Sequence, residues 1–301
     1  MNITCLISLI ETIEQNSISK AAKNLHMTQS ALSQQLQALE KSLNSQILIR
    51  SNKGVTLTPE GEIALSYAET IVNLYKNMLK DLDQSKNSLM NEIKIISCNS
   101  VGEYLLPCTL HLYKKNHKNI KFNLKNENTK IITEYISNCS ADIGFIDAKI
   151  NKEGIECTNL FTGNLVFIYS PKNNYIKSDD ISLFEISKLP LILLPKENML
   201  RQIIDNMFID ANISPEDLNI DIELDTIESI KASVLANNGV SIVPYTSVKK
   251  DLYTNSLKTV LINDSVPKYN ICMIYQKNRL QQSHIKEFIS YMKKYGCETF
   301  C

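Results

Sequence analysis

Hydrophobic residues within the first forty-five positions recur at intervals of three and four, which is typical of amphipathic helices. They predict one helix over residues 3–14, a short second helix over 18–25 and a third over about 29–43. Ser17 and Thr28 directly precede the second and third segments, and both residue types suit the N-cap position. The pattern therefore predicts three helices joined by tight turns.

The third predicted helix has two distinct faces. Its apolar stripe consists of four leucines: Leu32, Leu36, Leu39 and Leu43. The opposite arc is polar but almost uncharged and consists of Ser30, Ser33, Gln34, Gln37 and Lys41, with Gln29 at its edge. Ser and Gln can hydrogen-bond to base edges in the major groove, and a helix N-terminus favours phosphate. This face therefore indicates DNA binding, although a small helical bundle used for dimerisation fits the same periodicity.

Two short strands are predicted after this helix, over residues 47–50 and 55–58. The turn between them ends in Gly54, whose permissive backbone suits a hairpin. Such a hairpin beside a helix-turn-helix is a wing, with Arg50 and Lys53 placed to meet phosphates. Residues 1–58 contain five basic and three acidic residues, so this region is weakly basic.

A long helix is predicted from Pro59 to about residue 86, because Thr58 can cap it and Pro suits the first helical position. Its apolar stripe consists of Ile63, Ala64, Tyr67, Ala68, Ile71, Leu74, Tyr75, Met78 and Leu82. A helix of this length spans about 40 Å and cannot bury its stripe alone. We therefore expect a partner helix from a second copy; packing on the next domain is the alternative.

Beyond residue 91 the pattern alternates between strand and helix, which favours α/β sheets with helical crossovers. The predicted strands are 93–97, 120–124, 143–146, 165–169, 191–194, 220–224, 241–243 and 271–275. The predicted helices are 105–115, 131–138, 203–211, 227–236 and 285–295. Ligands of such sheets bind beyond the carboxyl ends of the strands.

Composition adds limits to this picture. The 301 residues contain 44% hydrophobic residues and 32 basic against 32 acidic ones. The eight cysteines show no C-x-x-C spacing, and we find neither a signal peptide nor a long apolar span, which favours a reducing cytoplasm. The four histidines form no metal-spaced cluster, and no phosphate loop or nucleophile elbow is present. We therefore expect no catalytic residues, no metal and no cofactor, and a binding protein rather than an enzyme.

Residues 17–33, Leu39-Glu40 and 50–61 together resemble the signature of LysR-type transcriptional regulators. The resemblance implies that the helix beginning near Thr28 enters the major groove and that the wing contacts the backbone of double-stranded DNA. The DNA-binding candidates are Thr28, Gln29, Ser30, Ser33, Gln34, Gln37, Arg50 and Lys53. Many family members have Arg where this chain has Gln34, and Gln prefers adenine whereas Arg prefers guanine.

The resemblance continues in residues 99–107, 141–146 and 237–244, which are similar to the family's effector domain. It implies a fold of several domains: a winged helix-turn-helix over 1–58, a linker helix over 59–88 and a two-lobed α/β domain over 91–301 that is similar to periplasmic solute-binding proteins. Lobe I would span 91–163 and 268–301, and lobe II 164–267. The chain would cross between lobes near 162–164 and 264–268.

A small-molecule effector is expected between these lobes. The candidates to bind it are Asn99, Ser100, Val101, Asn128, Thr129, Asn198 and Thr226. Ser100 follows a strand and precedes a helix, which suits a carboxylate or another small anion. On the second lobe, residues 196–201 lack the small hydroxyl residues that the family often offers, which weakens the anion interpretation there. Helix capping is the competing role for each polar candidate.

The resemblance also implies a homodimer that pairs into a tetramer, with RNA polymerase as a potential partner. The lack of a long apolar run predicts no membrane contact. A redox-sensing regulator is an alternative, because Cys98 would lie near the effector pocket and Cys297 and Cys301 are close in sequence. Free buried thiols and a frayed tail explain these cysteines as well. A cytosolic solute-binding protein without DNA function is the alternative from a different class.

Overall fold

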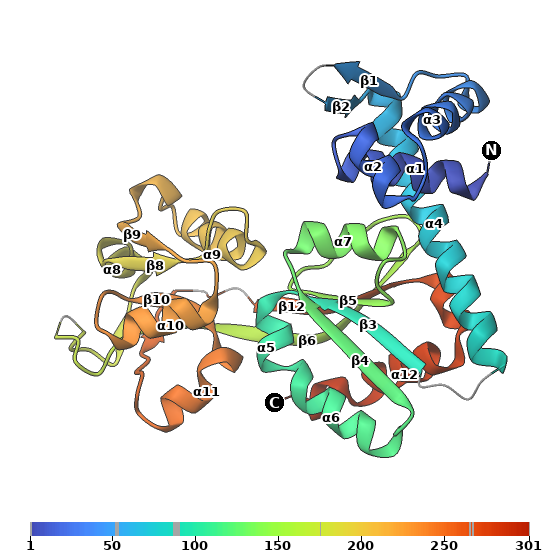
Figure 1. Cartoon of the computed structure of the whole chain (residues 1–301). Helices are drawn as coiled ribbons and strands as arrows, with labels where there is room; N and C mark the ends of the chain where they lie inside the picture. Colours follow the sequence, from blue (N-terminus) through green and yellow to red (C-terminus); the bar gives the residue numbers. More distant parts are fainter. Residues whose placement is uncertain are drawn as a thin grey trace. The chain divides into compact units, whose positions relative to one another are not determined.

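The computed structural model describes residues 2–51, 54–86, 91–174, 176–264, 266 and 268–300. The chain divides into two compact units. One consists of Met1–Leu89 with Ser137–Ser140, and the other of Met90–Ile136 with Ala141–Cys301. Figure 1 labels the helices and strands of both units.

The first unit begins with three short helices, as predicted. They are α1 (Ile3–Glu14), α2 (Ile18–Asn24) and α3 (Gln29–Leu43). Both predicted caps are confirmed, because the Ser17 hydroxyl accepts a hydrogen bond from the Lys20 amide and the Thr28 hydroxyl accepts one from the Ala31 amide. Leu43 is half in solvent, but the rest of the predicted leucine stripe is buried in a core with these partners: Leu6, Leu9, Ala21, Ala22, Ile47 and Val55.

The predicted wing is a two-stranded antiparallel hairpin of β1 (Leu48–Ser51) and β2 (Gly54–Leu57). The Asn16 side chain accepts a hydrogen bond from the Val55 amide at 3.0 Å, which ties the second strand to the end of α1. Gly54 has a φ of +126°, and an added Cβ would lie 2.5 Å from Asn16 Oδ1. Glycine is therefore required at this end of the hairpin, both for its backbone conformation and for close approach to Asn16.

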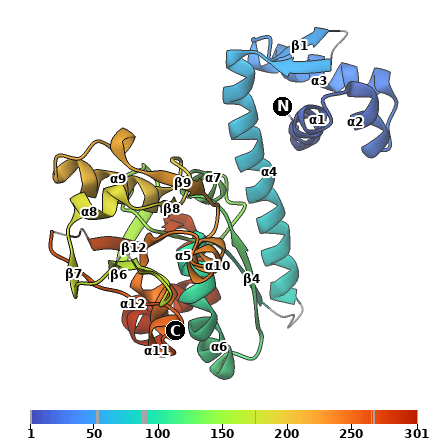
Figure 2. The same ribbon diagram turned by 90° about the vertical axis from the view of Figure 1, so that its left-hand side faces the viewer.

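α4 (Pro59–Lys86) is the predicted long helix, and the Thr58 hydroxyl accepts a hydrogen bond from the Gly61 amide at its start. Figure 2 shows it as one continuous helix. Ala68 and Val72 are buried in the core of the first unit. We find no described helix of the chain that is long and apolar enough to cross a membrane.

The second unit is built on a six-stranded sheet of order β10-β6-β12-β5-β3-β4. Its strands are β3 (Asn91–Ser97), β4 (Ile120–Asn126), β5 (Ile143–Ile146), β6 (Ile155–Ile168), β10 (Ser241–Pro244) and β12 (Lys268–Gln276). β3 runs parallel to both β4 and β5, whereas β12 is antiparallel to β5 and β6. β6 extends from one lobe into the other, because its last residues pair with β10 of the second lobe (Figure 1).

Helices of the first lobe pack on this sheet. They are α5 (Asn99–Tyr104), α6 (Leu106–Asn116), α7 (Thr129–Ser137) and α12 (Ser283–Thr299), with the 3-10 turn η2 (Lys277–Gln281) before α12. Tyr113 of α6 and Phe288 of α12 meet edge to face, with ring centroids 4.9 Å apart. The helix predicted over 105–115 corresponds to α6, whereas the short helix α5 before it was not predicted. Pro107 lies in the first turn of α6, where its missing N–H costs no hydrogen bond.

The second lobe contains a parallel pair of strands, β8 (Leu191–Leu193) and β9 (Ile220–Glu223), and a second pair, β7 (Asp180–Ile181) and β11 (Leu261–Ile262). Its helical elements are α8 (Leu183–Lys188), α9 (Met199–Asp210), η1 (Pro215–Asp217), α10 (Ile227–Leu235) and α11 (Tyr245–Tyr253). The sequence pattern did not predict α8, α11, β7 or β11. Two lobes joined by long strands confirm the predicted class of fold.

Candidate functional site

The polar face of α3 is open to solvent. Gln29, Ser30, Gln34 and Gln37 are exposed, and Ser33 is half-buried. Thr28 caps the helix, and its hydroxyl oxygen lies 3.1 Å from the hydroxyl oxygen of Ser30. The first helical turn therefore presents small and amide side chains without a formal charge, which is the chemistry that reads base edges.

Two other polar residues of α3 are taken up by internal contacts. The Gln35 side-chain oxygen accepts a hydrogen bond from the Ser8 hydroxyl at 2.6 Å. Glu40 accepts from the amides of Ile47 and Leu48 at 3.0 and 3.1 Å, which holds the start of the wing. The single acid of α3 is thus directed to the wing backbone and away from the exposed face, where it would repel phosphate.

The wing brings a basic side chain beside α3. Nη1 of Arg50 lies 3.5 Å from Oγ of Ser33 as a hydrogen-bond donor. Arg50 itself is exposed. Lys53, the other predicted phosphate contact, lies outside the described residues. All the other DNA-binding candidates lie on α3, at its cap or on β1, so the fold brings them to one side of the first unit.

The apolar stripe predicted on the long helix is largely exposed. The most exposed side chains are Tyr67 at 68% and Ile63 at 62%. The remaining exposed large apolar residues of α4 are Ile71, Leu74, Tyr75, Met78, Leu79 and Leu82. Ala68, which was predicted for the same stripe, faces the core of the first unit instead. So many exposed apolar residues on one helix indicate a surface for another molecule.

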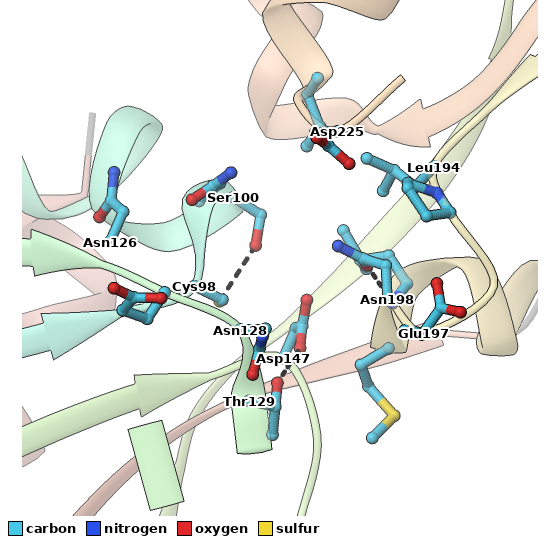
Figure 3. A pocket seen from close by; sticks show the side chains of 16 residues that line it. Cys98, Ser100, Asn126, Asn128, Thr129, Asp147, Leu194, Glu197, Asn198 and Asp225 are labelled. Carbon is cyan, nitrogen blue, oxygen red and sulfur yellow. Dashed lines mark hydrogen bonds between the residues drawn. The ribbon is translucent and has the colours of Figure 1, made fainter. Parts of the chain in front are cut away.

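A second candidate site lies between the lobes of the second unit, in a cavity of about 430 Å³. From the first lobe it is lined by residues that follow the carboxyl ends of β3, β4 and β5. From the second lobe it is lined by residues that follow β8 and β9, which are also parallel. Carboxyl ends of parallel strands share one sheet edge, which explains why residues so far apart in sequence meet here. Figure 3 shows the two groups of side chains facing each other.

Five of the seven predicted effector-binding residues line this cavity: Asn99, Ser100, Asn128, Thr129 and Asn198. Val101 and Thr226 do not belong to the described lining. Val101 is fully buried in the core, and Thr226 caps α10 by accepting a hydrogen bond from the Ser229 amide at 3.1 Å. Val101 therefore lies in the core of the domain, and Thr226 has the capping role that was its alternative.

Capping also occupies two of the lining residues. Oδ1 of Asn128 accepts a hydrogen bond from the Ile131 amide at 2.9 Å, and Oδ1 of Asn198 accepts one from the Leu200 amide at 2.9 Å. The Ser100 hydroxyl is buried and lies 3.3 Å from Sγ of Cys98. Only the amide nitrogens of the two asparagines remain to donate, so their roles as cap and as ligand contact are compatible.

Asp147 is the lining residue that the sequence analysis missed and that the fold makes most prominent. It follows β5 directly and is only 3% exposed. Its Oδ1 accepts a hydrogen bond from the Thr129 hydroxyl at 3.3 Å. Burial raises the pKa of this carboxyl from 3.8 to about 6. Its position after a predicted strand, which identified Ser100, could also have identified Asp147.

Further lining residues that were not predicted include three acidic ones, Glu127, Glu197 and Asp225. Asn126, Leu194, Pro195, Met199, Leu200 and Ile227 complete the described lining with Cys98. The described lining contains no lysine, arginine or histidine. The anion suggested by Ser100 would therefore meet carboxylates and no cationic side chain.

The thiols offer little redox chemistry at this cavity. Burial raises the pKa of Cys98 well above its usual value, and the negative charge of Asp147 raises it further. A thiol that resists ionisation is a poor nucleophile. Cys297 is a free, exposed thiol, Cys108 is disulfide-bonded, and Cys301 lies outside the described residues. No group of three His, Cys, Asp or Glu suited to a metal ion occurs among the residues that the structure describes.

Comparison with known families gives two matches, which together cover most of the chain. Residues 5–62 match the family described as bacterial regulatory helix-turn-helix protein, lysR family. Residues 86–296 match the LysR substrate binding domain. The chain belongs to the LysR family of transcriptional regulators. The two matches fall on the part of the chain that carries α3 and the wing and on the part that carries the cavity.

Relatives of this LysR-family chain include probable RuBisCO transcriptional regulators. The protein from Gracilaria tenuistipitata var. liui is 26% identical over 279 residues, which are 92% of this chain and 90% of that protein. The protein from Cyanidium caldarium is 29% identical over 290 residues, which are 95% of this chain and 88% of that protein. The resemblance thus extends over nearly the whole length of both.

Solved structures of full-length regulators share the fold. CbnR, in a complex with its target DNA, is 20% identical with a TM-score of 0.71, over 98% of this chain and 100% of that one. Full-length BenM is 26% identical with a TM-score of 0.59, over 100% of this chain and 99% of that one. The predicted fold of the LysR-type regulators is therefore confirmed for both units.

Proposed function

We propose that this LysR-family regulator reads operator DNA as a homodimer through α3 and the wing. The observation that carries the proposal is the uncharged Ser and Gln face of α3, with Arg50 beside Ser33. Gln29, Ser30, Ser33, Gln34 and Gln37 would face bases, and Thr28 with Arg50 and Lys53 would meet the backbone. Gln34 favours adenine at the base that it contacts.

Pairing of subunits is proposed to occur through α4, because its exposed stripe needs a partner helix. Two copies of α3 would then read half-sites related by a dyad, spaced by about one or more turns of DNA, roughly 34–36 Å each. The weak positive charge of residues 1–58 supports this, since a lone copy gains little affinity from phosphates. CbnR in its complex with target DNA supports the same use of the fold. Further pairing into a tetramer is proposed from the family resemblance.

Regulation is proposed to come from a small effector that binds between the two lobes. Lobe I would span 91–163 with 268–301, and lobe II 164–267. The helix 59–88 would link these lobes to the DNA-binding domain 1–58. An effector with unequal affinity for open and closed lobes shifts their equilibrium. That shift would change the DNA bend or the contact with RNA polymerase. We propose that the protein works in the cytoplasm by binding alone, without catalysis.

A redox-sensing regulator is less well supported by the site. Cys98 is the cysteine nearest to the effector cavity, and its burial beside Asp147 opposes formation of the reactive thiolate. The cavity instead offers hydrogen-bonding side chains from both lobes, which is the arrangement of a binding site.

The proposed function is tested by recovering bound DNA from genomic fragments with the purified full-length protein and sequencing it. We expect enrichment of a dyad-symmetric site. Gln29→Ala and Ser33→Ala should change the enriched sequence, whereas Ser42→Ala, on the same helix with its hydroxyl bonded to the Leu39 carbonyl, should not. Recovery of the same sequences by all three variants would refute base reading by this face.

A further inference from the structure

The cavity between the lobes is unusually acidic for a site expected to hold an anion. Four of its described lining residues are carboxylates: Glu127, Asp147, Glu197 and Asp225. Glu127 forms an ion pair with Lys125 at 2.8 Å. The other three have no ion-pair partner within the part of the chain that the structure describes. An uncompensated negative charge therefore faces any ligand that enters.

Asp147 is the carboxylate of the cavity for which a missing counter-charge matters most, because it is buried. A surface carboxylate is hydrated at little cost, but this one is 3% exposed, and its hydrogen bonds come from its own backbone amide, the Thr129 hydroxyl and the Cys98 thiol, none of which carries a positive charge. Burying a carboxylate without a counter-charge is costly, and the site would recover that cost if a ligand supplied the charge. In Figure 3 the carboxyl groups of Asp147 and Asp225 both point toward the space between the lobes.

Most helix starts at the cavity are capped, which weakens their attraction for an anion. Four helices begin at the cavity, α5, α7, α9 and α10, and a free N-terminus would attract an anion. A side-chain oxygen caps three of them: Asn128 caps α7, Asn198 caps α9 and Thr226 caps α10. The short helix α5 has no side-chain cap. An ammonium group, with three donors and no acceptor, finds carboxylate oxygens on both sides of the cavity, at Asp147 and Asp225.

We infer that the pocket between the lobes binds a small organic cation that carries an ammonium group, held between Asp147 of the first lobe and Asp225 of the second. This inference rests on the proposed effector role of the pocket and names the class of molecule that fills it. A cation that bridges acidic groups of both lobes stabilises the closed arrangement, which makes the ligand a regulator of lobe closure. The volume of about 430 Å³ fits a small metabolite. An organic cation is favoured over a metal ion because the described residues form no metal-binding group of three.

The test uses the full-length protein and two probes with the same four-carbon skeleton and opposite charge, 1,4-diaminobutane and succinate. L-lysine, with two ammonium groups and one carboxylate, serves as a third probe that separates simple amines from amino acids. Binding is followed by titration calorimetry and by the shift in melting temperature at neutral pH. We expect binding of the diamine or lysine and no binding of succinate. Binding of succinate alone, or of none of the three probes, would overturn the inference.

Variants assign the binding to this pocket. Asp225→Asn and Asp147→Asn keep the shape of each side chain and remove its charge, so each should weaken binding of the ammonium probe by about tenfold or more. Glu216→Gln in η1 removes an exposed carboxylate that does not line the cavity and should leave binding unchanged. Equal affinities in wild type, Asp225→Asn and Asp147→Asn would overturn the inference, since the cation would then bind elsewhere.

The inference and the proposed function can fail separately. If the ammonium probe binds, depends on Asp147 and Asp225, and yet leaves the footprint on enriched DNA unchanged, the ligand assignment stands and effector control through this pocket fails. If succinate binds and changes the footprint, effector control stands and the assignment of the ligand's charge fails.

Discussion

Nη1 of Arg50 in the wing lies 3.5 Å from Oγ of Ser33 in α3. The contact joins a strand that carries a fixed positive charge to the polar face of the helix. An exposed guanidinium next to a helix that fits the major groove is well placed to contact the flanking phosphate. The contact therefore places the candidate phosphate contact, Arg50, beside the face of α3 that is proposed to read bases.

Arg50→Ala should weaken binding to specific and non-specific DNA by a similar factor. The reason is that a phosphate contact carries no sequence information, while its loss lowers the salt dependence of the logarithm of affinity by about one. The measurement is a series of DNA titrations between about 0.05 and 0.2 M salt. Lys121→Ala, which removes an exposed lysine from β4, is the matched control. An unchanged salt slope for Arg50→Ala would show that the wing does not contact phosphate.

Tyr67→Glu should dissociate the proposed dimer. Tyr67 is 68% exposed on the apolar stripe of α4, and a dimer related by a dyad would bury the introduced charge twice. Analytical ultracentrifugation should show a dimer dissociation constant raised by at least about tenfold. Phe184→Glu introduces the same charge at a residue that is 63% exposed in α8, and it should leave the assembly unchanged. A Tyr67→Glu protein that remains dimeric at wild-type concentrations would contradict pairing through α4.

Asp147→Asn should stabilise the ligand-free protein at neutral pH. The folded-state pKa of about 6 lies above the ordinary value of 3.8, so the folded protein holds this proton more tightly than the unfolded chain does. The stability that protonation contributes is present at low pH and is lost as the pH rises through about 6. Removing the buried charge should therefore gain on the order of 3 kcal/mol above pH 7.

The gain should disappear near pH 4, where wild-type Asp147 is neutral. Urea unfolding of both proteins across this range measures it. Cys98 and Tyr269 are the titratable groups that interact with Asp147, and burial raises the pKa of both, so they stay neutral in this window. A constant difference in stability from pH 4 to pH 8 would contradict a buried, ionised Asp147.

Much of the first unit could be predicted from the sequence because its signals are local. The caps Ser17, Thr28 and Thr58 satisfy amides only three residues away, and the leucine stripe of α3 has the period of one helix. The predicted bounds of α1 and α3 match the structure for this reason. The wing followed from Gly54, which marks the end of the turn.

The second unit was predicted less completely, because its elements depend on distant partners. β6 spans 14 residues, but only its last part carries a continuous apolar run, since its first half pairs with β12 along a partly exposed face. β7 and β11 have two residues each and exist only through each other. No periodic pattern can develop in segments so short.

The effector site, too, could be predicted only where its sequence signals are local. Ser100, Asn128 and Asn198 could be found because each stands at a helix start, which is a local signal. Asp147 and Asp225 lie in comparable positions, but an acidic residue after a strand is usually hydrated. Only the tertiary fold shows that Asp147 is buried and that carboxylates from both lobes line one cavity.

The central claim is that α3 reads bases, and Gln34→Arg tests it most directly. DNA selected from a random pool by the wild type should contain a dyad-symmetric site with adenine at the base that Gln34 contacts. Gln34→Arg should change that base to guanine in both half-sites. Each protein should prefer its own base over the other by about 1–3 kcal/mol of binding free energy. Gln46→Arg adds the same charge at an exposed residue after α3 and should leave the selected base unchanged. An identical selected sequence for wild type and Gln34→Arg would contradict the account.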